Sequence, residues 1–273
     1  MASPARSGMR AAVLGSPIAH SLSPALHRAA YAQLDLDWHY DAIEVDEAAL
    51  PAFLASLDTE WAGVSLTMPL KEAVLPLLGE VDPTARELRS VNTVLPGHQG
   101  TDGWRGTNTD VYGMTQALVE AGLRQSPRTA TILGAGATAR SAVAALHRLG
   151  ARELVVCARR EETAYQVAEL GRRMGMSARS ARLDPDRQAI AADVVVSTLP
   201  GEAAAPWTDV IDHARGSLLD ASYHPWPTPL AAMWPGAGVA SGRDMLLWQA
   251  VEQVRLMTGL DPDPVAMARA LPG

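Results

Sequence analysis

Strand-like and helix-like segments alternate along the chain, and this order constrains the fold more than any other feature. The first series comprises strands beginning at Arg10, His39 and Gly63 and helices at 25–34, about 47–57 and after Pro69. A helix start is predicted at Ser23, as the capping residue, followed by Pro24. Parallel strands need long crossover connections, which helices supply, so the order predicts an α/β fold with a mainly parallel sheet covered on both faces.

A second alternating series begins after Asp110. It comprises a helix at 111–121 and strands at 129–134, 153–158, 193–198 and 217–221. The stretch GEAAAPW from Gly201 is expected to be a surface loop. A length of 273 residues favours two domains, and the helix after Asp244 is expected to return to the first. We therefore predict domains at 9–109 plus 245–273 and at 110–244.

Composition limits the partners of the chain. The net charge is -7, and no block of like charges or basic amphipathic stretch marks a nucleic-acid or membrane surface. No apolar run approaches the ~18 residues of a membrane span, and the first residues lack a secretory signal. We expect a cytoplasmic protein that acts on small molecules, as a monomer or a homodimer. The single cysteine, Cys157, lies in an apolar run and is expected to be a buried thiol.

Lysine occurs once in the chain, at Lys71, whereas the other 22 of the 23 basic residues are arginine. The two residue types are nearly interchangeable on a solvated surface. Arginine stays protonated, however, while a lysine amine can be tuned toward neutrality and act as a general base. The pattern therefore marks Lys71 as a candidate catalytic residue, against the alternative that one surface lysine survived by chance.

A glycine-containing turn follows the strand predicted at 129–134 and opens a helix. It reads Gly134, Ala135, Gly136, Ala137, Thr138, Ala139, which matches the Gly-x-Gly-x-x-Gly/Ala fingerprint in its required context. The first glycine permits the tight turn, the second lets the backbone approach a pyrophosphate, and the third small residue lets helix and strand pack closely. A dinucleotide-binding, Rossmann-type domain is therefore predicted, with a purely structural turn as the alternative.

The next predicted strand ends in Ala158, Arg159 and Arg160, about twenty residues past the fingerprint. An NAD enzyme is expected to present an acidic residue there to the ribose hydroxyl. A guanidinium can instead bind the 2′-phosphate in a bidentate manner, so the site favours NADP(H). The alternative is a pair of solvated arginines at the end of a strand.

Several polar segments of the first half follow the order of a known family. They are GSPIAHSLSPALH from Gly15, GVSLTMPLK from Gly63, SVNT from Ser90 and GTNTD from Gly106. With them the sequence resembles the shikimate dehydrogenase family over nearly its whole length. The resemblance implies that Lys71 is the catalytic lysine and Asp110 its carboxylate partner. It also implies that the substrate is bound by these two residues and by Ser21, Ser23, Thr67 and Asn92.

The second half carries two further segments of the same family, SYHPWPTPL from Ser222 and SGRDMLLWQA from Ser241. By this resemblance Tyr223 and Gln249 contact the substrate. Ala221, Gly242 and Met245 are expected at the cofactor, together with the fingerprint residues and the two arginines. Met245 and Gln249 are four residues apart and therefore share one helix face.

The chain departs from the family pattern at four positions. Ser65, Ala158 and Ser197 stand where the family commonly has asparagine, and Ala137 stands where a glycine is common. The substrate contact at position 65 is therefore left open. Arg159 keeps the charge expected at the ribose phosphate.

The resemblance implies an NADP-dependent oxidoreductase that reversibly reduces 3-dehydroshikimate to shikimate in aromatic amino acid biosynthesis. A quinate or aminoshikimate dehydrogenase is the nearest alternative, although Ser23 favours shikimate because a bulkier hydroxyl residue there is associated with quinate. A non-catalytic sensor of NADP or a shikimate-like ligand is an alternative of another class, against which Lys71 and Asp110 both argue. No histidine and carboxylate spacing suggests a metal site, and His20 and His27 are expected to pack or cap.

Overall fold

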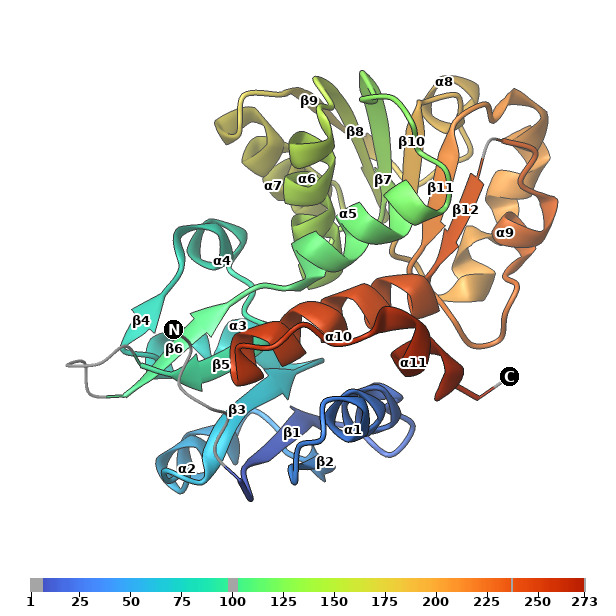
Figure 1. Ribbon diagram of the computed structural model, residues 1–273. Coiled ribbons are helices and arrows are strands. Elements are labelled where there is room, and N and C mark those ends of the chain that lie inside the picture. The colour runs from blue at the N-terminus through green and yellow to red at the C-terminus, as the bar shows by residue number, and fades with distance from the viewer. Residues whose placement is uncertain (1–6, 98–102, 237, 273) are drawn as a thin grey trace. The chain divides into compact units, whose positions relative to one another are not determined.

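The computed structural model describes residues 7–97, 103–236 and 238–272. The chain divides into two compact units, one made of Met1–Thr109 with Leu247–Gly273 and the other of Asp110–Leu246. Each unit is built around a six-stranded sheet (Figure 1). Assigning the first unit to the substrate and the second to the cofactor stays a prediction.

The first unit contains a mixed sheet in the order β2-β1-β3-β5-β6-β4. Only β5 runs antiparallel to its neighbours, so the predicted mainly parallel sheet is confirmed. The elements are β1 Arg10–Gly15, α1 Ser23–Gln33, β2 His39–Glu44, α2 Leu50–Ala55, β3 Trp61–Leu66, α3 Leu70–Ala73, η1 Leu75–Leu77, β4 Glu80–Val81, α4 Pro83–Leu88, β5 Thr93–Pro96, β6 Trp104–Thr107 and α11 Pro264–Arg269.

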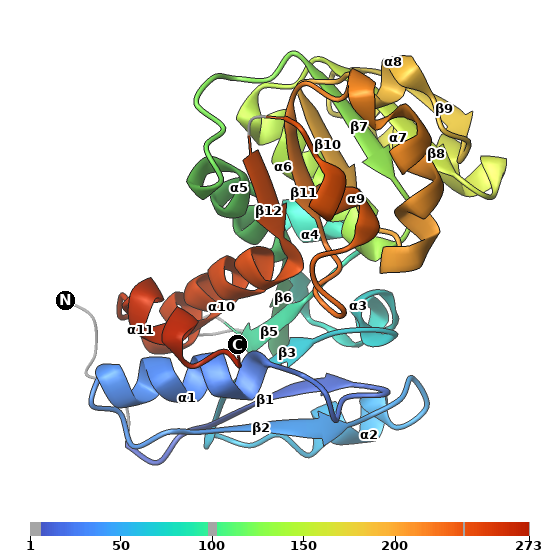
Figure 2. The ribbon, with the colours of Figure 1, turned by 90° about the vertical axis from the view of Figure 1, so that its right-hand side faces the viewer.

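Helices cover both faces of this sheet. On one face, a buried cluster joins alternate residues of β1 and β3, such as Leu14 and Val64, to Leu50 of α2, Leu70 of α3 and Ala85 of α4. On the other face lie α1 and α11, which pack side by side (Figure 2). Strand residues alternate between the two faces, which is why β3 is buried along its whole length.

The second unit contains a sheet in the order β12-β11-β10-β7-β8-β9, in which all ladders are parallel. Its elements are α5 Asp110–Glu120, β7 Thr129–Leu133, α6 Ala137–Leu149, β8 Glu153–Ala158, α7 Glu161–Arg173, β9 Ser177–Arg182, α8 Arg187–Ile190, β10 Val194–Ser197, η2 Gly201–His213, β11 Ser217–Asp220, α9 Pro229–Met233 and β12 Gly238–Ser241. The first strand is β7, so the order is 6-5-4-1-2-3, that of Rossmann folds. The predicted Rossmann-type architecture is confirmed.

Two helical layers enclose this second sheet. The helices α5, α6 and α7 pack in sequence on one face, and α8, η2 and α9 pack on the other. On the latter face a buried cluster joins Leu133, Val195 and Leu218 of the strands to Trp207 of η2 and Leu230 of α9. The carboxyl ends of β7 and β10 lie side by side where the strand order reverses, which is the place at which such sheets bind ligands.

The helix α10, Gly242–Thr258, continues through the boundary between the units. Its first five residues belong to the second unit and the remainder to the first.

No helix of the described residues is long and apolar enough to cross a membrane.

Two local predictions are wrong. Ser23 is the first helical residue of α1 rather than its cap; Leu22 occupies the capping position and its side chain makes no capping bond. The stretch from Gly201 is helical, not a surface loop, because Trp207 is 1% exposed and anchors η2 in the core. The short strands β4, β5, β6 and β12 and the edge strand β9, SARSAR, were not predicted, since neither length nor apolar alternation distinguishes them.

Cys157 is a free, buried thiol on β8, and burial raises its pKa to about 12. Because the thiolate is the reactive form, native protein at pH 8 is expected not to react with a disulfide reagent until it unfolds. The measurement is labelling by dithionitrobenzoate with and without denaturant. A Ser177→Cys variant, which places a thiol on an exposed position of β9, serves as the reactive control. Rapid labelling of the native wild type would contradict the burial.

Candidate functional site

The turn after β7 has the backbone that the dinucleotide fingerprint requires. Gly134 has a φ of +111°, and a Cβ there would collide with the hydroxyl of Thr198. Thr198 follows β10, and both its N–H and its hydroxyl donate to the carbonyl of Leu133, at 2.8 and 3.0 Å. The glycine is therefore needed both for its conformation and for the close approach of the neighbouring loop.

Gly136 occupies the capping position of α6, and no side chain caps this helix. The first N–H groups of a helix need partners from outside it, and they bind anions well. A Cβ added to Gly136 would meet no atom within 4 Å, so the space beside the turn is open to a phosphate. Ala135, Ala137 and Thr138 complete this turn. The residues fit the pyrophosphate of a dinucleotide.

The end of β8 lies next to this turn. The N–H of Gly134 donates to the carbonyl of Cys157 at 2.8 Å, which places Ala158, Arg159 and Arg160 at the same edge of the sheet. Both arginines are exposed. Neither guanidinium makes a hydrogen bond or an ion pair with the described residues, so both are available to a ligand phosphate.

The ends of β11 and β12 bring three more predicted cofactor-side positions together. Asp220 pairs with Ser241, so Ala221 and Gly242 are neighbours at the carboxyl edge. A Cβ on Gly242 would collide with the carbonyl of Ala221 and lie 3.1 Å from Cδ1 of Tyr223. The predicted cofactor residues thus follow four parallel strands at one edge of the sheet, with Met245 one turn into α10.

In the first unit, the predicted substrate residues also collect at one edge. The N–H of Thr67 donates to the carbonyl of Leu14, which places Thr67 beside the end of β1. The N–H of Val91 donates to the carbonyl of Lys71 at 2.8 Å, which fixes the backbone of the lysine beside Asn92. Because β5 is antiparallel, its first residues meet the carboxyl ends of β3 and β6. Three separate motifs therefore converge there.

Asn92 is the centre of a buried polar cluster. Its side chain is 1% exposed, and its Oδ1 accepts from the N–H of Thr109 at 2.8 Å and from the hydroxyl of Thr93 at 2.9 Å. Its Nδ2 donates to Oγ1 of Thr109 at 3.0 Å and to Oε1 of Gln249 at 3.3 Å. Asn92 and Gln249, predicted to contact the same substrate, are therefore within hydrogen-bonding distance of each other.

A continuous chain of hydrogen bonds connects Tyr40 on β2 to the side chain of Asn92. The hydroxyl of Tyr40 donates to Ser65 at 2.7 Å, and Ser65 donates to Oε1 of Gln253 at 3.0 Å. Nε2 of Gln253 then donates to the hydroxyl of Thr93 at 2.9 Å, which donates to Asn92. The directions of the donors fix which way the Asn92 amide faces. Ser65 thus takes part in orienting Asn92, the position whose role the sequence left open.

Ser21 and Ser23 lie at the start of α1, where Oγ of Ser21 accepts from the N–H of Ser23 at 3.4 Å. The carbonyl of Ser23 bonds to Nδ1 of His27 at 3.0 Å, and the ring of His27 stacks on Tyr40 with centroids 3.8 Å apart. The start of α1 is therefore coupled to the hydrogen-bond chain through packing.

Asp110 is the first residue of α5 and is 3% exposed. It follows Thr109 directly, so the bond from Thr109 to Asn92 fixes its backbone near the polar cluster. Met245 and Gln249 are 8% and 6% exposed and share one face of α10. The sequence did not identify Thr109, Thr198 or Gln253 as site residues. Thr109 and Thr198 could have been found from their place after predicted or short strands, and Gln253 from its spacing of four residues from Gln249 on the same helix.

The sequence matches two models of one family. Residues 13–94 match "Shikimate dehydrogenase substrate binding domain", and residues 242–271 match "Shikimate 5'-dehydrogenase C-terminal domain". A protein of Thermus thermophilus described as "Shikimate dehydrogenase (NADP(+))" is 37% identical over 266 residues, which cover 96% of this chain and 97% of that protein. The chain belongs to the shikimate dehydrogenase family.

Three solved structures support this membership. The shikimate dehydrogenase of Mycobacterium tuberculosis is 41% identical with a TM-score of 0.87, covering 96% of this chain and 98% of that one. A Thermus thermophilus enzyme in complex with NADP(H) and shikimate is 34% identical with a TM-score of 0.80, at coverages of 96% and 98%. A quinate dehydrogenase of Corynebacterium glutamicum in complex with NAD is 28% identical with a TM-score of 0.84, at coverages of 97% and 99%.

His27 is fully buried, and burial lowers its pKa from 6.5 to about 4, although the bond to Ser23 opposes the shift. The unfolded chain therefore binds a proton at a higher pH than the native one. The free energy of unfolding is expected to fall as the pH drops from 6.5 toward 4, by up to about 3 kcal/mol from this residue. Above pH 6.5 the contribution is fully present.

Urea unfolding at several pH values between 7 and 4 measures this effect. His27→Gln, which cannot titrate, is expected to flatten the decline, and His39→Gln, at an exposed position of β2, is expected to leave it unchanged. Equal declines in the wild type and in His27→Gln would refute the assignment.

Proposed function

We propose that this protein is an NADP-dependent shikimate dehydrogenase that reversibly reduces 3-dehydroshikimate to shikimate. The observation that carries the proposal is the convergence of Thr67, Lys71, Asn92 and Gln249 at one edge of the first sheet, in a family whose relatives bear this name. The Thermus structure with NADP(H) and shikimate supports the choice of both ligands.

The second unit holds the cofactor in this proposal. The turn Gly134 to Thr138 and the N-terminus of α6 bind the pyrophosphate, and Arg159 and Arg160 bind the 2′-phosphate. Ala221, Gly242 and Met245 lie at the nicotinamide end. When bound, NADP supplies the acceptor or donor of the hydride.

The first unit binds and orients the substrate in this proposal. Ser21 and Ser23 bind the carboxylate, while Thr67, Asn92 and Gln249 bind ring hydroxyls, with Tyr223 as a further substrate contact. Lys71 in its neutral form accepts the proton of the C3 hydroxyl during oxidation and returns a proton during reduction. Asp110 orients this amine and balances its charge. Tyr40, Ser65 and Gln253 act as positioning residues because they fix the Asn92 amide.

The proposal also covers the partners, the compartment and the oligomeric state. The partners are small molecules, the compartment is the cytoplasm, and the protein is a monomer or a homodimer. The quinate dehydrogenase among the similar structures makes quinate the competing substrate and NAD the competing cofactor.

Steady-state assays of shikimate and quinate, each with NADP and NAD, test the function. Efficient turnover restricted to shikimate with NADP is expected. A preference for quinate would transfer the proposal to that substrate. Binding of NADP without turnover of either acid would instead indicate a sensor.

Lys71→Arg tests the base because it keeps the positive charge but cannot accept a proton at neutral pH. The turnover number kcat is expected to fall about 10²–10⁴-fold, the usual contribution of general acid–base catalysis. The KM for shikimate is expected to change much less. Arg86→Lys, at a position on α4, is the control. Near-normal turnover of Lys71→Arg would rule out the proposed role.

Arg159→Ala tests the choice of cofactor. Loss of a charge-assisted hydrogen bond costs about 1.5–3 kcal/mol, so the KM for NADP is expected to rise about 10- to 100-fold. The KM for NAD, which lacks the 2′-phosphate, is expected to stay nearly constant. Arg152→Ala, just before β8 at the opposite edge of the sheet, is the matched control. An equal loss with both cofactors would contradict the assignment.

A further inference from the structure

A pocket lies in the first unit, at the edge of the sheet opposite the predicted substrate residues. It has a volume of about 630 Å³, within the range of roughly 300–1,000 Å³ typical of small-molecule sites. It is formed where β3 and β6 begin, where β5 ends and where α10 ends. At about 3.3 Å per residue along β3, Trp61 at the pocket is roughly 20 Å from Thr67. The pocket is therefore separate from the proposed active site.

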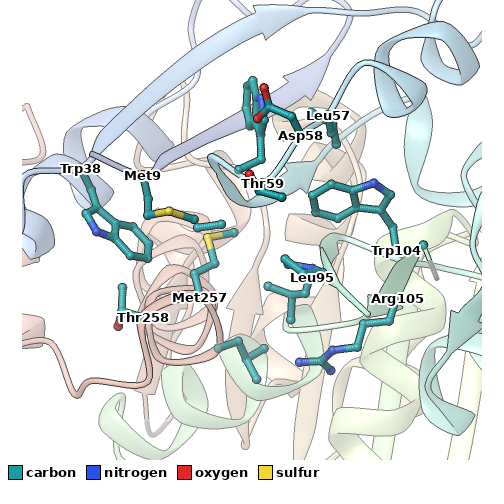
Figure 3. A pocket seen from close by; sticks show the side chains of 15 residues that line it. Met9, Trp38, Leu57, Asp58, Thr59, Leu95, Trp104, Arg105, Met257 and Thr258 are labelled. Carbon is teal, nitrogen blue, oxygen red and sulfur yellow. The ribbon is translucent and has the colours of Figure 1, made fainter. Parts of the chain in front are cut away.

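Its walls are mainly aromatic and apolar. Figure 3 shows Trp38 on one side and Trp104 on the other, with Met9, Met257 and Leu95 between them. Indole rings and methionine sulfur both make favourable contacts with an aromatic ligand. Trp38 and Leu95 are 8% and 2% exposed, so these walls are held by the core rather than free to collapse.

Among the described residues that line the pocket, Arg105 is the only basic one. It is half-buried on β6. Its guanidinium makes no hydrogen bond or ion pair with the residues that the structure describes. A guanidinium presents paired donors that match a carboxylate. This guanidinium is thus available to an anionic group.

An acidic side chain in the lining limits how much negative charge the pocket accepts. Asp58 lines it, and its Oδ1 accepts from the N–H of Glu60 at 2.9 Å. The guanidinium of Arg10 lies outside the lining, 4.6 Å from the ring centre of Trp61. One available cation and one carboxylate in the same lining suit a monoanion better than a doubly charged phosphate.

From these features we propose that the pocket binds a flat aromatic molecule bearing one carboxylate. The ring lies against Trp38, Trp104 and Met257, and the carboxylate binds Arg105. The site is independent of the proposed dehydrogenase site and stands whether or not that function holds.

Calorimetric titration of the full-length protein with 2-naphthoate tests the proposal, with neutral 2-naphthamide as the matched probe. Saturable binding of 2-naphthoate is expected, at least tenfold tighter than that of the amide. Saturating shikimate and NADP are expected not to displace it. Displacement by either, or no binding at probe concentrations on the order of millimolar, would overturn the proposal.

Two variants separate charge from apolar contact. Arg105→Gln is expected to weaken 2-naphthoate binding at least tenfold and leave 2-naphthamide unchanged, whereas Trp104→Leu weakens both probes alike. Arg86→Gln removes an exposed charge on α4, away from the lining, and is expected to change neither. Equal affinities of the wild type and Arg105→Gln for 2-naphthoate would refute the carboxylate assignment, and the circular dichroism spectrum and thermal unfolding of each variant check that it has folded.

Discussion

The requirement to satisfy the buried side chain of Asn92 organises the first unit. An amide that is 1% exposed must find protein partners for its donors and acceptor, because an unpaired buried polar group costs about 1–3 kcal/mol. The partners come from Thr109 after β6, Thr93 on β5 and Gln249 on α10. One side chain therefore ties together segments as distant in sequence as residues 92 and 249. The same bonds hold the proposed substrate contacts in fixed positions.

The second unit has a different requirement. The backbone N–H groups at the start of α6 must stay free of side-chain caps so that they can bind a ligand. The carboxyl ends of its parallel strands all open at one edge, and the fingerprint turn places the uncapped start of α6 there. Gly134 is required by its positive φ and by the neighbouring Thr198, whereas the space beside Gly136 is open. The Asn92 amide is thus paired within the first unit, whereas the N–H groups at the start of α6 are available for a ligand in the second.

The sequence predicted the strands of the parallel core best, since their apolar runs are long and bounded by turn residues. The strand β8 begins and ends as expected and β1 begins at the expected residue, whereas strands such as β5, β6 and β9 were missed because pairing rather than their own pattern stabilises them. The stretch around Trp207 was misjudged because Pro206 argues against a helix there, and only the burial of Trp207 in the core accounts for one. The motif residues of the proposed site came from the sequence and stay a prediction, whereas Gln253 and Thr109 were not anticipated.

By itself, the sequence determined the α/β class, the Rossmann-type turn at Gly134, the singular lysine and the family, because each depends on local pattern and residue chemistry. Tertiary structure alone decided that Ser65 and Tyr40 support Asn92, since these bonds join residues that no spacing rule relates. It also decided that Trp38, Trp104 and Arg105 share a pocket at the far edge of the first sheet. Strand order brings such residues together, and strand order follows from the packing of the whole unit rather than from any segment of it.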